Sequence, residues 1–156
     1  MSSLSHFNEA GEARMVDVSG KAQTKRTAIA EAFVRLNPEV LEALPRNPKG
    51  NPLEVARIAG VMAAKKTSEL IPLCHPLALS HVDVTATVSE GGIRILATAA
   101  TTGPTGVEME AMTAAAVAAL TVYDMTKALD KGIVIEFVRL MEKTGGKSGH
   151  YQRTAG

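Results

Sequence analysis

The stretch "HVDVTATV", residues 81–88, alternates strictly between polar and apolar side chains. Valine and alanine occupy the even-numbered positions, and histidine, aspartate and threonine occupy the odd-numbered ones. A period of two is typical of a β-strand with one covered and one solvated face. The stretch "IRILATAA", residues 93–100, follows after "SEGG" and completes a hairpin. The hairpin therefore predicts a sheet whose apolar face is covered by a second layer.

One helix of that layer is predicted to begin at Pro52. Asn51 is a suitable N-cap, proline is favoured at the first helical position, and Glu54 completes a pairing like a capping box. The helix is expected to continue through "LEVARIAGVMAAKKTSEL". Small residues along one side, Gly60 among them, give it a narrow face for close packing.

A second, longer helix is predicted over residues 107–131. Thr105 and Glu108 have the spacing of a capping box, and Gly132 is expected to be the C-cap. The segment "AMTAAAVAALTV" is apolar on nearly every side, so this part of the helix is expected to be buried.

Further strands are predicted at residues 15–18, 27–36 and 133–140. The stretch "KRTAIAEAFVRL" has the alanine and glutamate content of a helix, but its alternation favours a strand. A short helix is predicted in "NPEVLEAL", with Asn37 as N-cap and Pro38 at the first position. Mostly antiparallel strands with helices on one face make the predicted fold class an α+β sandwich.

The 156 residues suit one domain: residues 1–14 are expected to be a loose segment, 15–150 the domain, and 151–156 a tail. A net charge of +1 offers no global attraction for nucleic acid or an anionic membrane, and aromatic residues, at 3%, are too few for base stacking. One cysteine cannot form an internal disulfide, and no apolar run has the length of a membrane span or signal core. We therefore expect a soluble cytoplasmic protein.

The single cysteine, Cys74, precedes His75 between two prolines in "LIPLCHPL". The four histidines lack the spacing of a zinc motif. His75 is badly placed as a base for the thiol, because adjacent residues on an extended chain point in opposite directions. Two interpretations remain: a buried thiol beside a turn histidine, or a stiff elbow between the prolines that presents His75 to a ligand.

Asp124 and Lys127 share a face where the long helix becomes polar, because they are three residues apart. They are either an ion pair on a solvated helix end or a partly desolvated acid–base couple at the rim of the core.

Charged residues at three other places have a structural and a functional interpretation. Glu108 and Glu110 suit the positive end of a helix. Lys49 precedes a helix N-terminus, where an anion would be stabilised. Lys147 lies in "GGKSG", which lacks the spacing of a P-loop but is a basic loop that an anion can contact.

Four segments together closely resemble the molybdenum cofactor biosynthesis protein C family: "GEARMVDVSGKAQTKR", "ARIAGVMAAKKTSELIPLCHPL", "TGVEMEAMTAAAVAALTVYDMTKAL" and "GGKSG". The resemblance implies a ferredoxin-like fold and a single catalytic domain. It implies a lyase that converts 3′,8-cyclo-7,8-dihydroguanosine 5′-triphosphate into cyclic pyranopterin monophosphate and releases diphosphate. It further implies a hexamer of three dimers with active sites at subunit interfaces. No cofactor is implied, although magnesium can accompany the triphosphate.

The resemblance also implies roles for particular residues, and it favours the ligand-presenting elbow at His75. The implied catalytic residues are Asp124, Lys127 and Lys49. The implied substrate-binding residues are Leu73, Cys74, His75, Met109, Glu110, Glu108, Lys65, Lys66, Arg26, Lys143 and Lys147. Clustered cations suit a triphosphate, and paired acids and bases suit the proton transfers of ring formation.

Two other classes of protein remain open on the residues alone. One is a non-catalytic module that binds guanine nucleotides. This interpretation assigns no role to Asp124. The other is a structural oligomer that associates through an alanine-rich helix. Release of diphosphate from the cyclic triphosphate distinguishes an enzyme from both.

Overall fold

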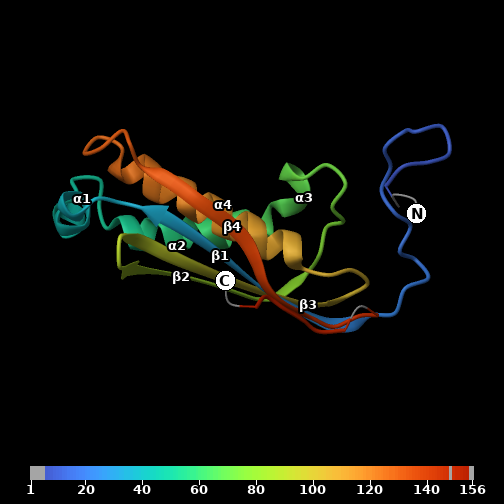
Figure 1. Cartoon of the computed structure of the whole chain (residues 1–156). Helices are drawn as coiled ribbons and strands as arrows, with labels where there is room; N and C mark the ends of the chain where they lie inside the picture. The colour runs from blue at the N-terminus through green and yellow to red at the C-terminus, as the bar shows by residue number, and fades with distance from the viewer. Residues whose placement is uncertain (1–5, 148, 155–156) are drawn as a thin grey trace.

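The computed structural model describes residues 6–147 and 149–154, which form a five-stranded antiparallel sheet with helices on one face (Figure 1). The strand order is β2-β3-β1-β4-β5. The strands are β1 (Thr24–Arg35), β2 (Leu79–Ser89), β3 (Gly92–Gly103), β4 (Val134–Thr144) and β5 (Tyr151–Gln152). The helices are α1 (Pro38–Ala43), α2 (Pro52–Lys65), α3 (Thr67–Leu70) and α4 (Glu108–Thr126), with a 3₁₀ turn at Leu44–Arg46.

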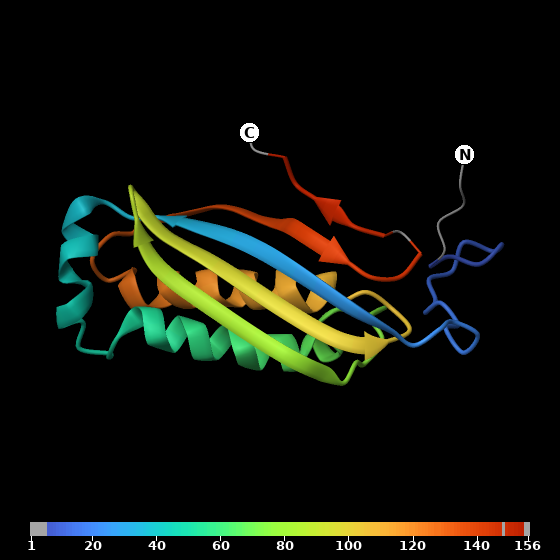
Figure 2. The same cartoon turned by 90° about the horizontal axis from the view of Figure 1, so that it is seen from below.

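The two long helices, α2 and α4, lie side by side against the same face of the sheet (Figure 2). The predicted fold class, a ferredoxin-like α+β sandwich, is confirmed. The β2–β3 hairpin is confirmed as well: Val84 faces the helices and is fully buried, whereas Asp83 beside it is exposed. The strand predicted from the alternation in "KRTAIAEAFVRL" is β1, at the centre of the sheet.

Small side chains let α2 and α4 approach each other closely. A Cβ atom on Gly60 of α2 would lie 3.0 Å from the carbonyl oxygen of Ala114 in α4 and 3.1 Å from a methyl group of Val84. The core is therefore alanine-rich on both helices and on β1. In the part of the chain that the structure describes, no helix combines the length and the apolar character needed to cross a membrane.

Both predicted asparagine caps are confirmed. The Asn51 side chain accepts a hydrogen bond from the backbone N–H of Leu53 at 3.0 Å, and the Asn37 side chain accepts one from Val40 at 2.9 Å. In each helix, proline follows the cap directly.

The two predicted capping boxes are wrong, because each glutamate binds a cation. Glu54 accepts hydrogen bonds from Arg57, one turn along α2. Glu108 lies 2.7 Å from the ammonium group of Lys143 on β4, and α4 has no side-chain N-cap. An ion pair between two elements replaces a local cap here.

The long helix ends five residues earlier than predicted, at Thr126. Asp130 accounts for the early end, because its carboxylate accepts hydrogen bonds from the backbone N–H of Gly132 and from the Asn37 side chain. Aspartate side chains that bond nearby backbone groups compete with helix continuation. Gly132 therefore belongs to the turn before β4 and is not the C-cap.

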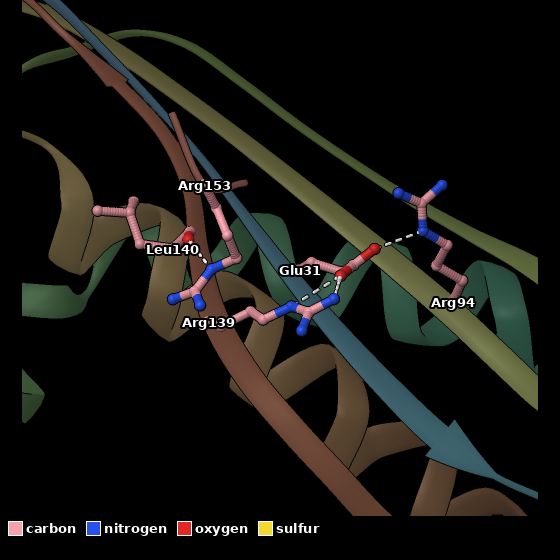
Figure 3. Close-up of polar contacts among 5 residues, drawn as sticks. All are labelled: Glu31, Arg94, Arg139, Leu140 and Arg153. Atoms are coloured by element: carbon pink, nitrogen blue, oxygen red, sulfur yellow. Dashed lines mark hydrogen bonds and ion pairs between the residues drawn. The ribbon is translucent and has the colours of Figure 1, made fainter. Parts of the chain in front are cut away.

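Two expectations about the chain ends differ from the structure. Residues 15–18 form no strand, and Asp17 accepts hydrogen bonds from the backbone and hydroxyl of Ser19 in a local turn. Tyr151–Gln152, expected in a tail, pairs with β4 as β5. Beyond it, the Arg153 side chain donates to the carbonyl of Leu140 at 2.8 Å, which anchors the chain to β4 (Figure 3).

Candidate functional site

A hollow of about 290 Å³ lies at the N-terminal end of α4. It collects residues that are far apart in the sequence, because the segment after α3 and the start of α4 meet there. Six of the predicted substrate-binding residues line it: Leu73, Cys74, His75, Glu108, Met109 and Glu110.

The elbow that carries Cys74 and His75 is fixed at both ends. Before it, the buried hydroxyl of Thr67 donates to carbonyl groups at the end of α2, and the N–H of Cys74 donates to Ile71. After it, the Thr101 hydroxyl donates to the carbonyl of Ala78 at 2.6 Å. The proline-bounded segment thus runs between a short helix and β2 with its path set by hydrogen bonds.

The charges of this hollow disfavour a cysteine nucleophile. Burial raises the pKa of the Cys74 thiol, and the carboxylates of Glu110 and Glu108 raise it further. The thiolate, not the thiol, is the reactive form, so Cys74 is a weak nucleophile here. Cys74 is half-buried and is better described as a lining residue of the hollow than as a nucleophile.

Glu110 is the buried acid of the hollow, with 4% of its surface exposed. Burial raises its pKa, and the nearby Glu108 raises it further. A carboxyl group with a raised pKa holds its proton more readily than an ordinary carboxyl group, which is a property of general acids and bases. Glu110 is thus chemically distinct from Glu108, which is paired with Lys143.

A second hollow, of about 660 Å³, adjoins the first and is basic. The two hollows share Lys21, Thr105, Gly106 and Glu108. The predicted residues Arg26, Lys143 and Lys147 line the second one. Together they form one continuous depression with a carboxylate-rich end and a cationic end.

Arg26 is held rigidly at the cationic end. Its guanidinium donates to the carbonyl groups of Gly103 and Pro104 at 2.8 and 3.1 Å. Gly146 packs against it with φ of 74°, and a Cβ atom there would lie 2.2 Å from a terminal nitrogen of Arg26. The glycine turn after β4 is therefore shaped to leave room for this arginine.

Lys65 and Lys66 lie apart from this cationic end. Lys65 lines a smaller hollow of about 350 Å³ that also contains His81. That hollow shares Leu77 with the first one, so Lys65 is its neighbour. Lys66 is exposed and is the C-terminal cap of α2.

The three predicted catalytic residues form a separate cluster at the opposite end of α4. The Lys127 ammonium is 2.8 Å from the Asp124 carboxylate, and the Lys49 ammonium is 3.5 Å from the carbonyl of Asp124. The hydrogen bond from Lys127, then its charge and that of Lys49, lower the pKa of Asp124. Of the two alternatives for this pair, the single chain shows the exposed ion pair, because the Asp124 side chain is 61% exposed.

The structure thus divides the predicted residues into two groups that one chain does not bring together. Glu110 and Asp124 are fourteen positions apart on α4, which is about 21 Å along the axis at about 1.5 Å per residue. A general acid or base must reach within about 3 Å of its proton. Asp124 therefore cannot act on a ligand in the hollow of its own chain.

Sequence reasoning assigned no role to Lys21, which lines both halves of the depression. His6, Val16 and Val18 of the N-terminal segment also line the first hollow. The signal for Lys21 was its place after Gly20 in the basic stretch "GKAQTKR". The other three carry no pattern that indicates a site.

Comparison with known proteins places the chain in a family. Residues 15–146 match the model of the MoaC family. A curated relative from Novosphingobium aromaticivorans, named cyclic pyranopterin monophosphate synthase, is 58% identical over 154 residues. The match covers 97% of this chain and 98% of the relative.

Proposed function

The chain belongs to the MoaC family, and we propose that it carries out the reaction of that family in the depression at the N-terminal end of α4. The activity itself, cyclic pyranopterin monophosphate synthesis in molybdenum cofactor formation, follows from family membership and from the identity to the relative so named. The chain is accordingly a lyase. The proposal concerns where the substrate binds and which residues act on it.

The observation that supports the proposal most strongly is that a carboxylate-rich hollow and a basic hollow adjoin and form one depression. The smaller one, with Cys74, His75, Met109 and Glu110, suits a ring system that presents amide and amine groups. The larger one, with Lys21, Arg26, Lys143 and Lys147, suits a triphosphate. The nucleotide 3′,8-cyclo-7,8-dihydroguanosine 5′-triphosphate has both parts in one molecule.

The cations have a chemical task. The cyclic phosphate forms when a substrate hydroxyl attacks the phosphorus next to the leaving diphosphate, and the bond to diphosphate breaks. Negative charge develops on the phosphate oxygens, which fixed cations such as Arg26 stabilise. The hydroxyl loses a proton, and the rearranging ring exchanges others, so the site also needs acids and bases.

The acid–base residues Asp124, Lys127 and Lys49 are proposed to come from a second copy of the chain. The outer side of α4 supports this, because Met112, Ala116 and the exposed Leu120 form an apolar stripe at a spacing of four residues. Such a stripe packs against a partner helix.

An antiparallel pair of α4 helices gives the required geometry. Position 117 is the midpoint between Glu110 and Asp124, and Ala116 lies at the centre of the stripe. A two-fold axis there would place Asp124 of each copy beside Glu110 of the other. Each pair of chains would then contain two complete sites.

Complementation between two inactive variants tests this arrangement. His75→Ala damages the hollow and Asp124→Asn damages the acid–base cluster. If one site uses both chains, a mixed pair contains one intact site. Co-expression in equal amounts should then restore about one quarter of the wild-type turnover, because half of the pairs are mixed and each has one intact site of two.

The readout is diphosphate release together with formation of the cyclic product. Co-expression of wild type with the double variant His75→Ala/Asp124→Asn is the control, because its mixed pairs contain no intact site if each site uses both chains and one intact site if each site lies within one chain. Absence of rescue, in co-purified mixed pairs with normal circular dichroism, would contradict the two-chain site. Binding of the triphosphate without diphosphate release by wild type would instead favour a non-catalytic nucleotide-binding module.

The hexamer of three dimers and the cytoplasmic location are part of the proposal. The two-chain site supports at least a dimer, and the single cysteine favours a reducing compartment. We further propose that no resident cofactor is needed and that magnesium, where present, arrives with the triphosphate. Among the described residues, no group of three or more histidine, cysteine, aspartate or glutamate side chains is arranged to hold a metal ion.

A further inference from the structure

The hydroxyl group of Thr24, at the start of β1, is buried and has no hydrogen-bond partner among the described residues. Buried polar side chains of folded proteins almost always have a partner, because an unpaired buried donor costs free energy. Within the described residues, Thr24 is the one side chain with a buried nitrogen or oxygen atom that is unpaired. This exception indicates a partner that the described residues do not supply.

Thr24 is also part of the wall of the larger, basic hollow at the cationic end of the depression. The even-numbered residues of β1 face the helices, because Ala28 and Ala30 are buried in the core there. Thr24 and Arg26 share this face, since side chains two positions apart on a strand point to the same side. Thr24 therefore belongs to the same wall as the arginine that we propose to bind phosphate.

The glycine turn after β4 packs against this part of β1. The two strands are neighbours in the sheet, so the end of β4 lies beside the start of β1 (Figure 1). A Cβ atom on Gly145 would lie 2.2 Å from the carbonyl oxygen of Lys25, the residue between Thr24 and Arg26. Lys147, which follows in the same turn, lines the basic hollow. Basic residues from β1 and from this turn therefore line one hollow together with Thr24.

We propose that the Thr24 hydroxyl binds a phosphate oxygen of the substrate, an inference that rests on the function proposed above. A phosphate oxygen is a charged acceptor, and the Thr24 hydroxyl is a donor that no other described group uses. In the unliganded chain the hydroxyl oxygen is covered, so the side chain has to turn before it can meet a ligand. No hydrogen bond holds the hydroxyl in place, and another staggered rotamer can bring it to the hollow.

The alternative partner of the hydroxyl is a bridging water molecule. Buried waters commonly bond polar groups that the chain leaves unpaired. The two partners have different consequences, because a structural water stabilises the unliganded fold, whereas a phosphate contact stabilises only the complex. The basic lining of the hollow, with Arg26 and Lys147, favours an anion as the partner.

A hydroxyl contributes to phosphate binding in a different way from a lysine. The ammonium group of Lys147 is a point charge on a flexible stem, and salt screens its attraction for any anion. A hydroxyl has no net charge and bonds one oxygen within a narrow range of distances and angles. The contribution of Thr24 to phosphate affinity should therefore depend little on salt, whereas that of Lys147 should decrease as salt is added.

The test measures binding of diphosphate to the full-length protein by calorimetry. Thr24→Val keeps the shape of the side chain and removes the hydroxyl, whereas Thr24→Ser keeps the hydroxyl. Thr27→Val is the matched control, because Thr27 is on the opposite face of the same strand and its hydroxyl already bonds that of Thr144. We expect Thr24→Val to bind diphosphate roughly tenfold or more weakly than wild type, at low and at high salt alike. Thr24→Ser and Thr27→Val should bind it about as tightly as wild type.

Thermal unfolding of the unliganded protein is the second measurement. Removal of an unpaired buried hydroxyl should leave Thr24→Val as stable as wild type or more stable, whereas Thr27→Val should be less stable, because it leaves Thr144 unpaired. Lower stability of Thr24→Val with unchanged diphosphate affinity would overturn the inference, since the hydroxyl would then bond within the fold or to a structural water. If valine prevents folding, Thr24→Ala and Thr24→Ser give the same comparison.

Arg26→Ala separates this inference from the proposed location of the site. If Arg26→Ala weakens diphosphate binding and Thr24→Val does not, the phosphates lie in the basic hollow without touching Thr24, and the inference alone is wrong. If neither variant weakens binding, the phosphates bind elsewhere, and the proposed location is wrong as well. If the effect of Thr24→Val disappears at high salt, the substitution acts through the neighbouring charges, which would also overturn the inference.

Discussion

Lys127 and Asp124 form an ion pair of 2.8 Å one turn apart at the exposed end of α4. An exposed pair of this kind contributes little to the free energy of unfolding, because solvent screens the two charges. If the pair has only a structural role, its loss should therefore change the stability of the protein very little. Turnover and stability can separate the structural role from the catalytic one.

Asp124→Asn keeps the shape of the side chain but removes its ability to accept a proton. If Asp124 is an acid–base residue, we expect turnover to fall on the order of a hundredfold or more while the fold and the assembly persist. Diphosphate release measures turnover, and circular dichroism with light scattering checks the fold. A folded, assembled variant with near-normal turnover would remove Asp124 from the catalytic residues.

Lys127→Ala extends this experiment. The substitution should lower turnover as well, and the double variant should lose less than the product of the two single losses, because residues that act as a unit are not additive. Lys131→Ala, a few residues further on, is the control and should leave turnover unchanged. Fully multiplicative losses would show that Asp124 and Lys127 act independently.

Glu31 should make stability depend on pH below neutrality. Burial alone would raise its pKa, but the hydrogen bonds from Arg94 and then Arg139 outweigh burial and lower it from 4.5. The unfolded chain therefore binds the proton more readily. The resulting stabilisation is present above about pH 4.5 and is lost as the pH falls through the lowered value.

Glu31→Gln removes this pH dependence. We expect a loss of about 1–3 kcal/mol at neutral pH, at the lower end because the two arginines are partly hydrated already, and a smaller difference from wild type in acid. Urea unfolding at several pH values measures it. Glu54→Gln breaks an exposed pair whose charges solvent screens, so it should cost clearly less than Glu31→Gln at neutral pH. A constant difference between Glu31→Gln and wild type across the pH range would contradict the prediction.

Close packing between the long helices should make Gly60 intolerant of larger residues. A Cβ atom at this position meets backbone and Val84 methyl groups at 3.0 to 3.2 Å, and none of these contacts is the end of a flexible side chain. We expect Gly60→Ala to destabilise by about 1–3 kcal/mol through overpacking, despite the higher helix propensity of alanine. Gly132→Ala, whose nearest atoms belong to the Asp130 side chain, is the comparison. Thermal unfolding should show Gly60→Ala as the weaker variant, and equal or higher stability would contradict tight packing of α2 on α4.

Sequence patterns predicted the helices and strands that depend mainly on contacts between residues close together in the sequence. The alternation in β2, β3 and β1 and the asparagine–proline starts of α1 and α2 depend on nearest neighbours, so the sequence alone indicated them. The end of α4 depends on Asp130 reaching Asn37 in another part of the chain. Glu108 binds Lys143 on β4 for the same reason. Such tertiary contacts override local signals and are not readable from spacing.

The candidate site divides in the same way. The resemblance indicated which residues matter, and six of them line one hollow. The separation of about 21 Å between Glu110 and Asp124 follows from fourteen positions on one predicted helix, whereas the resemblance alone assigned both residues to one site. Lys21 was missed because a lysine in an irregular segment has no periodic pattern, and only the fold brings it between the two hollows.

The glycine turn after β4 should control the position of Arg26. Gly146 has φ of 74°, which L-residues rarely adopt, and a Cβ there would lie 2.2 Å from a terminal nitrogen of Arg26. Gly146→Ala therefore has to displace either the turn or the guanidinium. We expect a loss of roughly 1–2 kcal/mol in stability and weaker binding of the triphosphate end. Gly149→Ala also has a positive φ, but no atom lies within 4 Å, so it should affect stability and leave triphosphate binding intact. Equal triphosphate affinity in both variants would show that the turn does not position Arg26.

The cationic end of the depression should bind diphosphate through charge. Arg26 is the best-fixed cation there, since its guanidinium is held by two carbonyl groups, and Lys147 is the exposed one. Arg26→Ala and Lys147→Ala should each weaken diphosphate binding in calorimetry. The effect of Arg26→Ala should be stronger, because this variant loses a preorganised donor as well as a charge.

His75→Ala and Lys65→Ala should weaken binding of the complete triphosphate substrate, and added salt should weaken it further because it screens the charges. Lys131→Ala, outside the depression, controls for the loss of one positive charge. If diphosphate binds the Arg26 and Lys147 variants as tightly as wild type at low salt, the phosphates bind elsewhere, and the hollow that contains Lys65 and His81 becomes the next candidate.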